Sequence, residues 1–164
     1  MTEVTERTNG STDIEGLVRR TGPDLLAYFV RRVADREDAA DCVAETFVVL
    51  WRRRDSVPTD DDAARAWLFG IARKVLSSFL RGRLRRSNLA DRLRLELRED
   101  AVAPRDTELE EALGRLRRDD AELVRLVAWE GFGVEEAGAV LGLSPAASRK
   151  RYSRARASLR ALLN

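Results

Sequence analysis

The stretch GFGVEEAGAVLGLSPAASRKRYSRARASLR, residues 131–160, decides the fold of the C-terminal part of this chain. A short helix is predicted over residues 134 to about 141, and Gly142 supplies the turn after it, because glycine adopts backbone angles that other residues avoid. Ser144 followed by Pro145 is typical of an N-cap and the first residue of a second helix. The stretch therefore predicts a helix-turn-helix, a fold that places its second helix on DNA.

The second helix separates its residues onto two faces when it is indexed at 3.6 residues per turn. The face predicted to pack on the first helix, where Gly138 and Leu141 leave room, carries Tyr152, Ala155, Leu159 and Leu162. The opposite face is predicted to be exposed and carries Ala146, Lys150, Ser153 and Arg154. No acidic residue follows Ser144, so the exposed face is polar and positively charged.

Four arginines border this exposed face: Arg149, Arg151, Arg156 and Arg160. Small residues near the start of the helix, Ala146 and Ala147, allow it to enter a major groove. The arginines can then reach phosphates, and the central polar residues can address base edges. The alternative is a solvated basic helix on an unrelated bundle, but the cap, the turn and the one-sided charge together favour a DNA-binding unit.

Composition limits what the rest of the chain can be. With 164 residues, 44% of them hydrophobic, it can bury one good core or two small ones. Its 30 basic and 28 acidic residues leave a net charge of only +2, but they are unevenly distributed. Residues 73–98 hold nine basic and two acidic residues, whereas residues 35–62 hold nine acidic residues and four arginines. We expect two different partners, one anionic and one a protein.

Several kinds of chemistry are excluded by the residue types present. The chain has no histidine, and Cys42, predicted to be a half-buried helix residue, is its only cysteine. A zinc site, a disulfide or a Ser–His or Cys–His catalytic arrangement therefore cannot form within one chain. Without a glycine-rich phosphate loop, we expect no cofactor and no enzymatic activity. The polar start and the absence of an apolar run of 18 residues predict a cytoplasmic protein without membrane contact.

Helical periodicity continues through the rest of the sequence, without the alternation typical of strands. Residues 1–13 are predicted to be disordered, Gly22 and Pro23 to interrupt a helix, and the sequence RRRDSVPTDDD around Pro58 to form a loop. The helices predicted in the N-terminal part span residues 13–21, 24–34, 36–53 and 62–84. The inward face of the third is predicted to carry Ala40, Val43, Ala44, Phe47, Leu50 and Trp51.

Residues 87–106 are predicted to be a flexible linker, because they are charged and poor in aromatic residues. A further helix is predicted from Thr107, with Leu109, Ala112, Leu113 and Leu116 on its apolar face. The predicted fold class is all-α, with an N-terminal domain over residues 14–86 and a C-terminal domain over residues 107–164. Two domains on a tether suit the recognition of two DNA sites.

Three motifs in this order resemble the extracytoplasmic-function sigma factors, the smallest class of bacterial promoter-recognition subunits. The resemblance covers about residues 15–163. The matching motifs are DAADCVAETFVVLW at 38–51, WLFGIAR at 67–73, and WEGFGVEEAGAVLGLS with RKRYSRAR at 129–156. Sequence departures include Lys74 for the usual Asn, Ser78 for an acid, and Ala137 with Gly138 for an Ile–Ala pair.

The resemblance implies partners for each part of the chain. In this family the acidic helix docks on the clamp of the largest subunit of core RNA polymerase, and the second-largest subunit is also contacted. The implied polymerase-binding residues are Asp38, Asp41, Glu45, Phe47 and Trp51. The resemblance also implies an anti-sigma protein that covers the DNA-binding or polymerase-binding faces.

The resemblance further implies two promoter contacts. The loop at about residues 54–62 helps to hold a flipped base of the minus-10 element, and the next helix contacts the melted strand. The implied minus-10 residues are Trp67, Arg73, Lys74, Arg81 and Arg83, although burial preference favours Trp67 as a core residue over a stacking platform. Lys150, Ser153 and Arg154 match base-contacting positions for the minus-35 element, and the helical wheel selects the same residues.

The sequence as a whole predicts a transcription initiation factor that binds core RNA polymerase, recognises minus-35 and minus-10 elements, and does not form homodimers. The alternative is a dimeric helix-turn-helix regulator that acts without polymerase and binds palindromic sites. A purely structural helical protein would leave the acid-free helix from Ser144 onwards unexplained.

Overall fold

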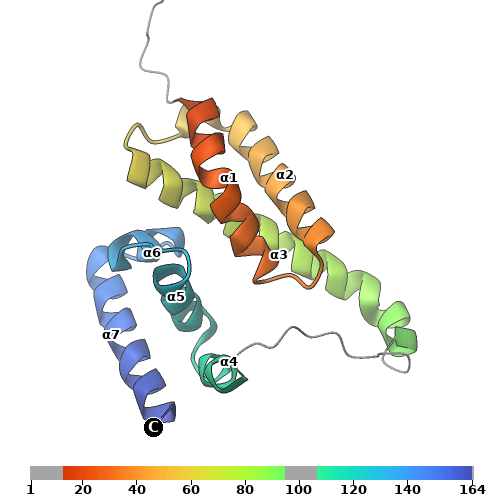
Figure 1. Ribbon diagram of the computed structural model, residues 1–164, viewed down its shortest axis with the longest axis vertical. Coiled ribbons are helices and arrows are strands. Elements are labelled where there is room, and N and C mark those ends of the chain that lie inside the picture. The colour runs from red at the N-terminus through yellow and green to blue at the C-terminus, as the bar shows by residue number, and fades with distance from the viewer. Residues whose placement is uncertain (1–12, 95–106, 164) are drawn as a thin grey trace, which may run out of the picture. The chain divides into compact units, whose positions relative to one another are not determined.

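The structure is a computed structural model that describes residues 13–94 and 107–163. Within these ranges it is entirely helical, as predicted, and contains no strand (Figure 1). The disorder predicted before residue 13 and the part of the predicted linker at 95–106 lie outside the described residues. The helices are α1 (Ile14–Val30), α2 (Arg36–Arg52), α3 (Asp61–Arg94), α4 (Thr107–Gly114), α5 (Arg118–Ala128), α6 (Val134–Val140) and α7 (Pro145–Leu162), with a short 3-10 helix at Arg54–Ser56.

Contacts between residues divide the chain into two compact units, Met1–Ala72 and Arg73–Asn164. The division falls inside α3, which continues to Arg94. Residues 87–94 are therefore helical, where a linker was predicted. Their composition explains the difference, since leucine, arginine and alanine are good helix formers even in a strongly charged segment.

Helix α1 runs without a break from Ile14 to Val30, so the interruption predicted at Gly22 and Pro23 is wrong. A proline inside a helix removes a backbone hydrogen bond and costs about 3 kcal/mol. The side chains of Leu17 and Leu25, one on each side of the proline, are buried. Burying such a side chain contributes about 1.5–3 kcal/mol. Packing of the continuous helix therefore outweighs the local penalty.

The core of the first unit lies where α3 crosses the antiparallel pair α1 and α2 (Figure 1). The ring of Tyr28 on α1 meets Phe69 on α3 edge to face, with ring centroids 5.5 Å apart. Tyr28 makes a second edge-to-face contact with Phe29, at 5.2 Å. All three rings are buried. Each such pair contributes about 0.5–1.5 kcal/mol beyond the area that it buries.

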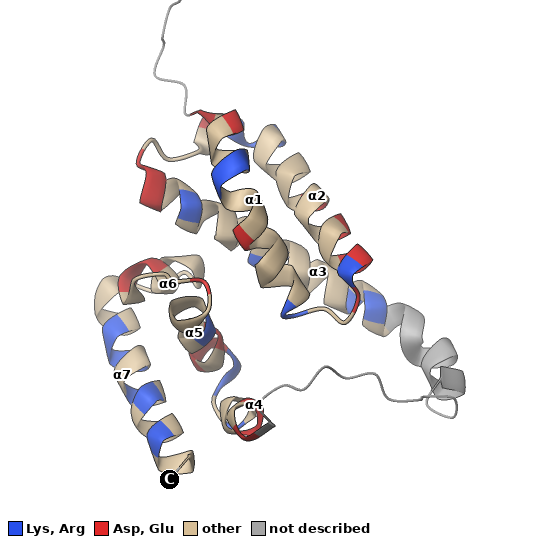
Figure 2. Cartoon of the chain, viewed as in Figure 1, with Lys and Arg blue, Asp and Glu red and all other residues tan. Residues whose placement is uncertain are grey.

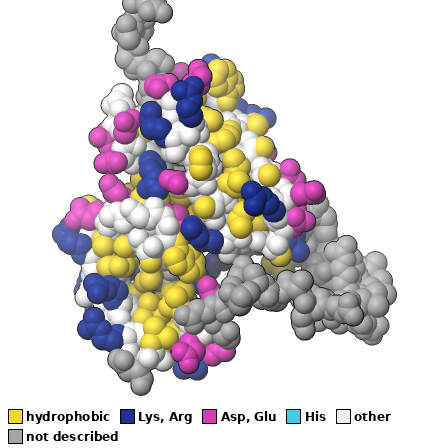
Figure 3. All heavy atoms as spheres, viewed as in Figure 1, with side chains coloured by type: hydrophobic (Ala, Val, Ile, Leu, Met, Phe, Trp, Pro, Cys, Tyr) yellow, Lys and Arg dark blue, Asp and Glu magenta, His cyan; other side chains and the backbone are white. Residues whose placement is uncertain are grey.

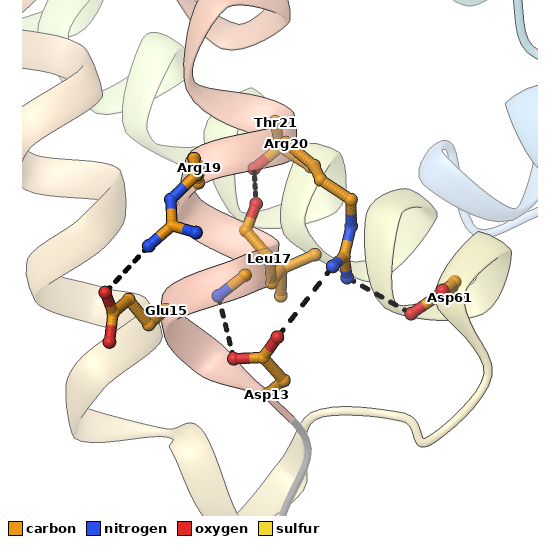
Figure 4. Close-up of polar contacts among 8 residues, drawn as sticks. Asp13, Glu15, Leu17, Arg19, Arg20, Thr21 and Asp61 are labelled. Atoms are coloured by element: carbon orange, nitrogen blue, oxygen red, sulfur yellow. Dashed lines mark hydrogen bonds and ion pairs between the residues drawn. The ribbon is translucent and has the colours of Figure 1, made fainter.

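The starts of α1 and α3 are linked by charged side chains (Figure 4). Asp13 caps α1 by accepting a hydrogen bond from the Gly16 N–H at 2.8 Å. Arg20 lies 3.9 Å from the Asp13 carboxylate and 3.2 Å from that of Asp61. A Cβ at Gly16 would lie 2.7 Å from Asp13 Cγ, so only glycine lets the capping carboxylate approach this closely.

Helix α2 buries a different set of residues from the predicted one, namely Ala39, Cys42, Thr46 and Leu50. Of the predicted inward residues only Leu50 is buried, and Trp51 is 62% exposed. The buried face of α2 is thus rotated relative to the predicted one and includes Thr46. The hydroxyl of Thr46 donates to the Cys42 carbonyl oxygen at 2.7 Å. This hydrogen bond satisfies the only polar group of the side chain, so threonine is tolerated in the core.

The turn between α6 and α7 confirms the predicted helix-turn-helix. Gly142 has a φ of +73°, in the region that favours glycine. Its N–H donates to the Ala139 carbonyl at 3.0 Å, and the N–H of Leu143 donates to the Gly138 carbonyl at 2.9 Å. This pair of hydrogen bonds is a Schellman motif, which ends α6 and redirects the chain.

The start of α7 is also as predicted. Pro145 is the first helical residue, and Ser144 caps the helix by accepting a hydrogen bond from the Ala147 N–H at 3.3 Å. Helix α4 packs its predicted apolar face against α5 and α7. The residues of this cluster are Ala112, Leu113, Ala121 and Leu159, surrounded by Leu109, Leu116, Val124 and Trp129.

Helices α6 and α7 approach most closely at Gly138 and Ser148. Ser148 is fully buried, and its hydroxyl donates to the Ser144 carbonyl at 2.8 Å. A Cβ at Gly138 would overlap Ser148 Oγ and lie 2.5 Å from Ser148 Cβ. The buried face of α7 therefore consists of Ser148, Ala155 and Leu159, whereas Leu162, predicted to face inward, is 39% exposed.

We predict that Gly138→Ala destabilises the second unit by about 1–3 kcal/mol, because the added methyl group forces α6 and α7 apart. Amide hydrogen exchange of α6 and α7 in the full chain measures this change. Gly114→Ala is the matched control, since a Cβ there meets nothing within 4 Å. A double variant with Ser148→Gly should recover part of the loss, and equal exchange in Gly138→Ala and the control would contradict the packing argument.

Candidate functional site

The face of α7 that lies opposite its buried residues is the first candidate site. Ala146, Lys150, Ser153 and Arg154 are all exposed, as predicted from the helical wheel. Basic residues follow one another along α7, and no acidic residue interrupts them (Figure 2). An exposed helix with small residues at its start and cations along its length can enter a major groove.

Two of the arginines assigned to this surface are held by acidic residues of the preceding helices. Arg149 forms an ion pair with Glu135 on α6. Arg151 is half-buried, and its Nε donates to Asp120 on α5 at 2.6 Å. The sequence of α7 alone gave no signal for these pairs, because both acids lie earlier in the chain.

The remaining cations of α7 differ in the contacts that they make within the chain. Lys150 and Arg154 are exposed and make no ion pair or hydrogen bond within the part of the chain that the structure describes. Arg156 is exposed and lies over the ring of Tyr152, 5.8 Å from its centroid. The charges available to an anionic partner are therefore those of Lys150, Arg154 and Arg156, because none of the three forms an ion pair with a described residue.

The exposed face of α2 is the second candidate site. Asp41, Glu45, Val48 and Arg52 recur at intervals of three or four residues and are all exposed. Val48 is 43% exposed, and Trp51 lies at the edge of the same face. Figure 3 shows hydrophobic side chains reaching the surface beside charged ones over α1 and α2. Acidic residues around exposed apolar ones suit a protein partner.

The structure places the five predicted polymerase-binding residues unequally. Asp41, Glu45 and Trp51 are exposed, and Asp38 is half-buried. Phe47 is half-buried and turned toward α1, where a Cβ on Gly22 would lie 3.8 Å from Phe47 Cζ. Val48 was missed, although its spacing from Asp41 and Glu45 could have identified it.

The outer face of α3 is the third candidate site. Trp67, Lys74 and Arg81 are separated by seven residues each, close to two helical turns, and so share one face. Lys74 and Arg81 are exposed, and Arg81 donates to Ser78 Oγ at 3.1 Å. Trp67 is half-buried. Its exposure lies between that expected of a core residue and that expected of a platform on which a base stacks.

The other two predicted minus-10 residues, Arg73 and Arg83, do not share this face. They lie six and sixteen positions from Trp67, about 120° and 160° around the helix at 100° per residue. The structure therefore brings three of the five residues together on α3.

Cys42 is buried inside α2 and does not belong to any of these faces. Burial, together with the carboxylates of Asp38, Asp41 and Glu45, raises the pKa of its thiol to about 11. The thiol stays protonated at neutral pH and is a poor nucleophile. Among the described residues, no cluster of acidic or cysteine side chains could hold a metal ion. No helix of the described ranges is long and apolar enough to cross a membrane.

Comparison with protein families finds two matches in chain order. The family model described as Sigma-70 region 2 matches residues 17–86. The model described as Sigma-70, region 4 matches residues 106–159. The first range contains the candidate faces of α2 and α3, and the second contains the helix-turn-helix.

Proteins with similar sequences are named as RNA polymerase sigma factors. The ECF RNA polymerase sigma factor EcfG of Rhodopseudomonas palustris is 32% identical over 145 residues, which cover 86% of this chain and 80% of that protein. The RNA polymerase sigma factor CnrH of Cupriavidus metallidurans is 37% identical, over 77% of this chain and 74% of its own length.

Solved structures that resemble this chain are also those of sigma factors. The sigma factor RpoE of Bartonella quintana, in complex with the anti-sigma factor NepR, superposes with a TM-score of 0.66 at 28% identity, over 92% of this chain and 96% of that one. CnrH in complex with the cytosolic domain of CnrY superposes with a TM-score of 0.62 at 34% identity, over 92% and 86% of the two chains.

The ion pair between Arg149 and Glu135 leads to a prediction about DNA affinity. Glu135→Gln should release Arg149 for one more phosphate contact, so binding of the full chain to duplex DNA of arbitrary sequence should tighten several-fold at low salt. The slope of log K against log[salt] should become steeper by about 0.9. A salt titration followed by fluorescence anisotropy measures both effects.

Glu111→Gln is the control for this prediction. It removes the same charge from an exposed position on α4 whose side chain makes no ion pair in the described ranges. Equal changes in slope for the two variants would show that net charge alone, rather than release of Arg149, controls the affinity.

Proposed function

The chain belongs to the sigma-70 family of RNA polymerase subunits, in its extracytoplasmic-function group, and from this premise we propose which of its exposed faces meets which partner. A sigma factor binds core RNA polymerase and directs it to promoters through the minus-35 and minus-10 elements. The alternative of a dimeric regulator acting without polymerase is not favoured, because it leaves the region 2 match without a role.

We assign the minus-35 element to α7. The observation that carries this assignment is the row of exposed residues Lys150, Ser153 and Arg154, which lies opposite the buried face of the helix. Lys150 and Arg154 have no acidic partner within the described residues and lie in the middle of this face, so they are suited to bidentate contacts with base edges. Arg156, on the flank, is assigned to phosphates, and Arg149 is assigned to a phosphate that it reaches only when its ion pair with Glu135 opens.

We assign core RNA polymerase to the exposed face of α2. Asp41 and Glu45 supply negative charge at the centre of the face, and Val48 and Trp51 supply apolar surface. A large aromatic residue beside charges is the composition expected at the energetic centre of an interface. Phe47, which is packed toward α1, supports the shape of this face from behind.

We assign the melted minus-10 strand to the face of α3 that carries Trp67, Lys74 and Arg81. A partly exposed aromatic ring followed by two cations suits a strand whose bases can stack and whose phosphates need neutralising. The proposed roles of Arg73 and Arg83 are limited to phosphates that pass the sides of the helix.

The proposed function has further consequences for partners and location. RpoE and CnrH were solved with the anti-sigma factor NepR and the cytosolic domain of CnrY, and we propose that a protein of this kind also controls the present chain. Since its targets are polymerase and promoter DNA, we place its activity in the cytoplasm. It acts as a monomer and performs no covalent chemistry of its own.

Transcription in vitro tests the function. Core polymerase supplied with this chain should start transcripts from promoters that share one motif with two spaced, non-palindromic elements. Arg154→Ala should relax discrimination at one base of the upstream element by about 1–3 kcal/mol and leave the downstream element unchanged. Sequencing of transcripts made with and without the chain measures both results, and palindromic sites would instead support the dimeric regulator.

Binding to core polymerase tests the assignment of α2. Reversing both charges, with Asp41→Arg and Glu45→Arg, should weaken binding by roughly tenfold or more, because like charges brought together at an interface cost up to several kcal/mol. Helix content, measured by circular dichroism, should not change. The control pair Glu108→Arg and Glu111→Arg makes the same change in net charge on α4, and an equal loss from both pairs would contradict the assignment.

A further inference from the structure

Arg53 follows the last residue of α2, and its position is fixed by the end of that helix. Its backbone N–H donates to the carbonyl oxygens of Val49 at 3.0 Å and Leu50 at 3.1 Å. The backbone of Arg53 is therefore held as the C-cap of α2, although its side chain is exposed. A cation at this position also interacts favourably with the helix dipole.

The side chain of Arg53 extends over Trp67 of α3, with its guanidinium carbon 5.6 Å from the centroid of the indole ring. Both residues lie in the unit Met1–Ala72, so their contact is internal to that unit. An arginine over an aromatic ring keeps its N–H groups available at the edge of the guanidinium plane. The half-buried ring thus positions the cation.

The charge of Arg53 is not neutralised within the described residues. Arg20 and Arg65, in the same unit, form ion pairs with Asp61 and Asp24. Arg53 has no carboxylate partner there, and its guanidinium group interacts with the ring of Trp67. A fixed, exposed arginine without a counter-ion is suited to an external anion.

We infer that Arg53 binds a phosphate of the melted minus-10 strand. This inference rests on the proposed function, which assigns that strand to the face of α3 that begins at Trp67. Arg53 extends the face onto the end of α2, where its guanidinium group lies over the ring of Trp67. Arg53 is a positioning residue for the strand backbone and contributes no preference between bases.

The test uses holoenzyme made from the full chain and core polymerase. The probe is a forked DNA carrying a promoter identified by transcript sequencing, with its minus-10 element single-stranded. Arg53→Met removes the charge but keeps an unbranched side chain that can pack on the ring of Trp67. Affinity for the fork should fall about fivefold to tenfold, and the slope of log K against log[salt] should become shallower by about 0.7, the value for one phosphate of a single strand.

Two further variants separate a phosphate contact from a structural role. Arg53→Lys should restore most of the affinity and the salt slope, because it restores the charge. Arg36→Met removes the same charge at the exposed start of α2 and should bind like the unaltered chain. Binding of core polymerase should be the same for all four proteins.

The outcomes are distinguishable. Wild-type affinity and slope for Arg53→Met would overturn the inference and leave the proposed function in place. Equal losses for the methionine and lysine variants would mean that Arg53 acts through packing on Trp67. If holoenzyme with the unaltered chain bound the fork no better than closed duplex, the proposed function itself would fail.

Discussion

A chain of this length that forms two small cores must bury one face of each helix and leave the other in water. Ala155 and Leu159 fix the rotation of α7, and Thr46 and Leu50 fix that of α2. The exposed side chains on the opposite faces are thereby held in place by residues that never touch a partner. The surfaces assigned to DNA and to polymerase are consequences of how the cores pack.

The distribution of charge along the chain affects the binding of partners more than the net charge does. The net charge of +2 conceals an acid-free α7 and an acid-rich segment around α2. Within the second unit, Glu135 and Asp120 already neutralise two of the arginines of α7. Because phosphate contacts dominate affinity for DNA of any sequence, such internal pairs weaken non-specific binding more than base recognition. The same pairs hold α7 to α6 and α5.

Local signals in the sequence were sufficient to predict the helix-turn-helix. Gly142, Ser144 and Pro145 act on their own backbone, so their effects do not depend on the rest of the fold. Predictions failed where tertiary packing decides: α1 continues through Pro23, α2 turns Thr46 inward, and α7 leaves Leu162 exposed. The contact between Arg53 and Trp67 joins two helices across a loop, and no pattern in the sequence predicts it. The roles assigned to individual residues remain predictions.

The buried thiol of Cys42 makes this chain convenient for spectroscopic labelling. With its pKa raised to about 11, the thiol is almost entirely protonated at the pH used for maleimide chemistry, and the fold covers it. A cysteine introduced on the surface would therefore be modified selectively without replacing the native one. Dyes attached to one such position in each unit would report, by energy transfer, how the distance between the units changes when polymerase binds.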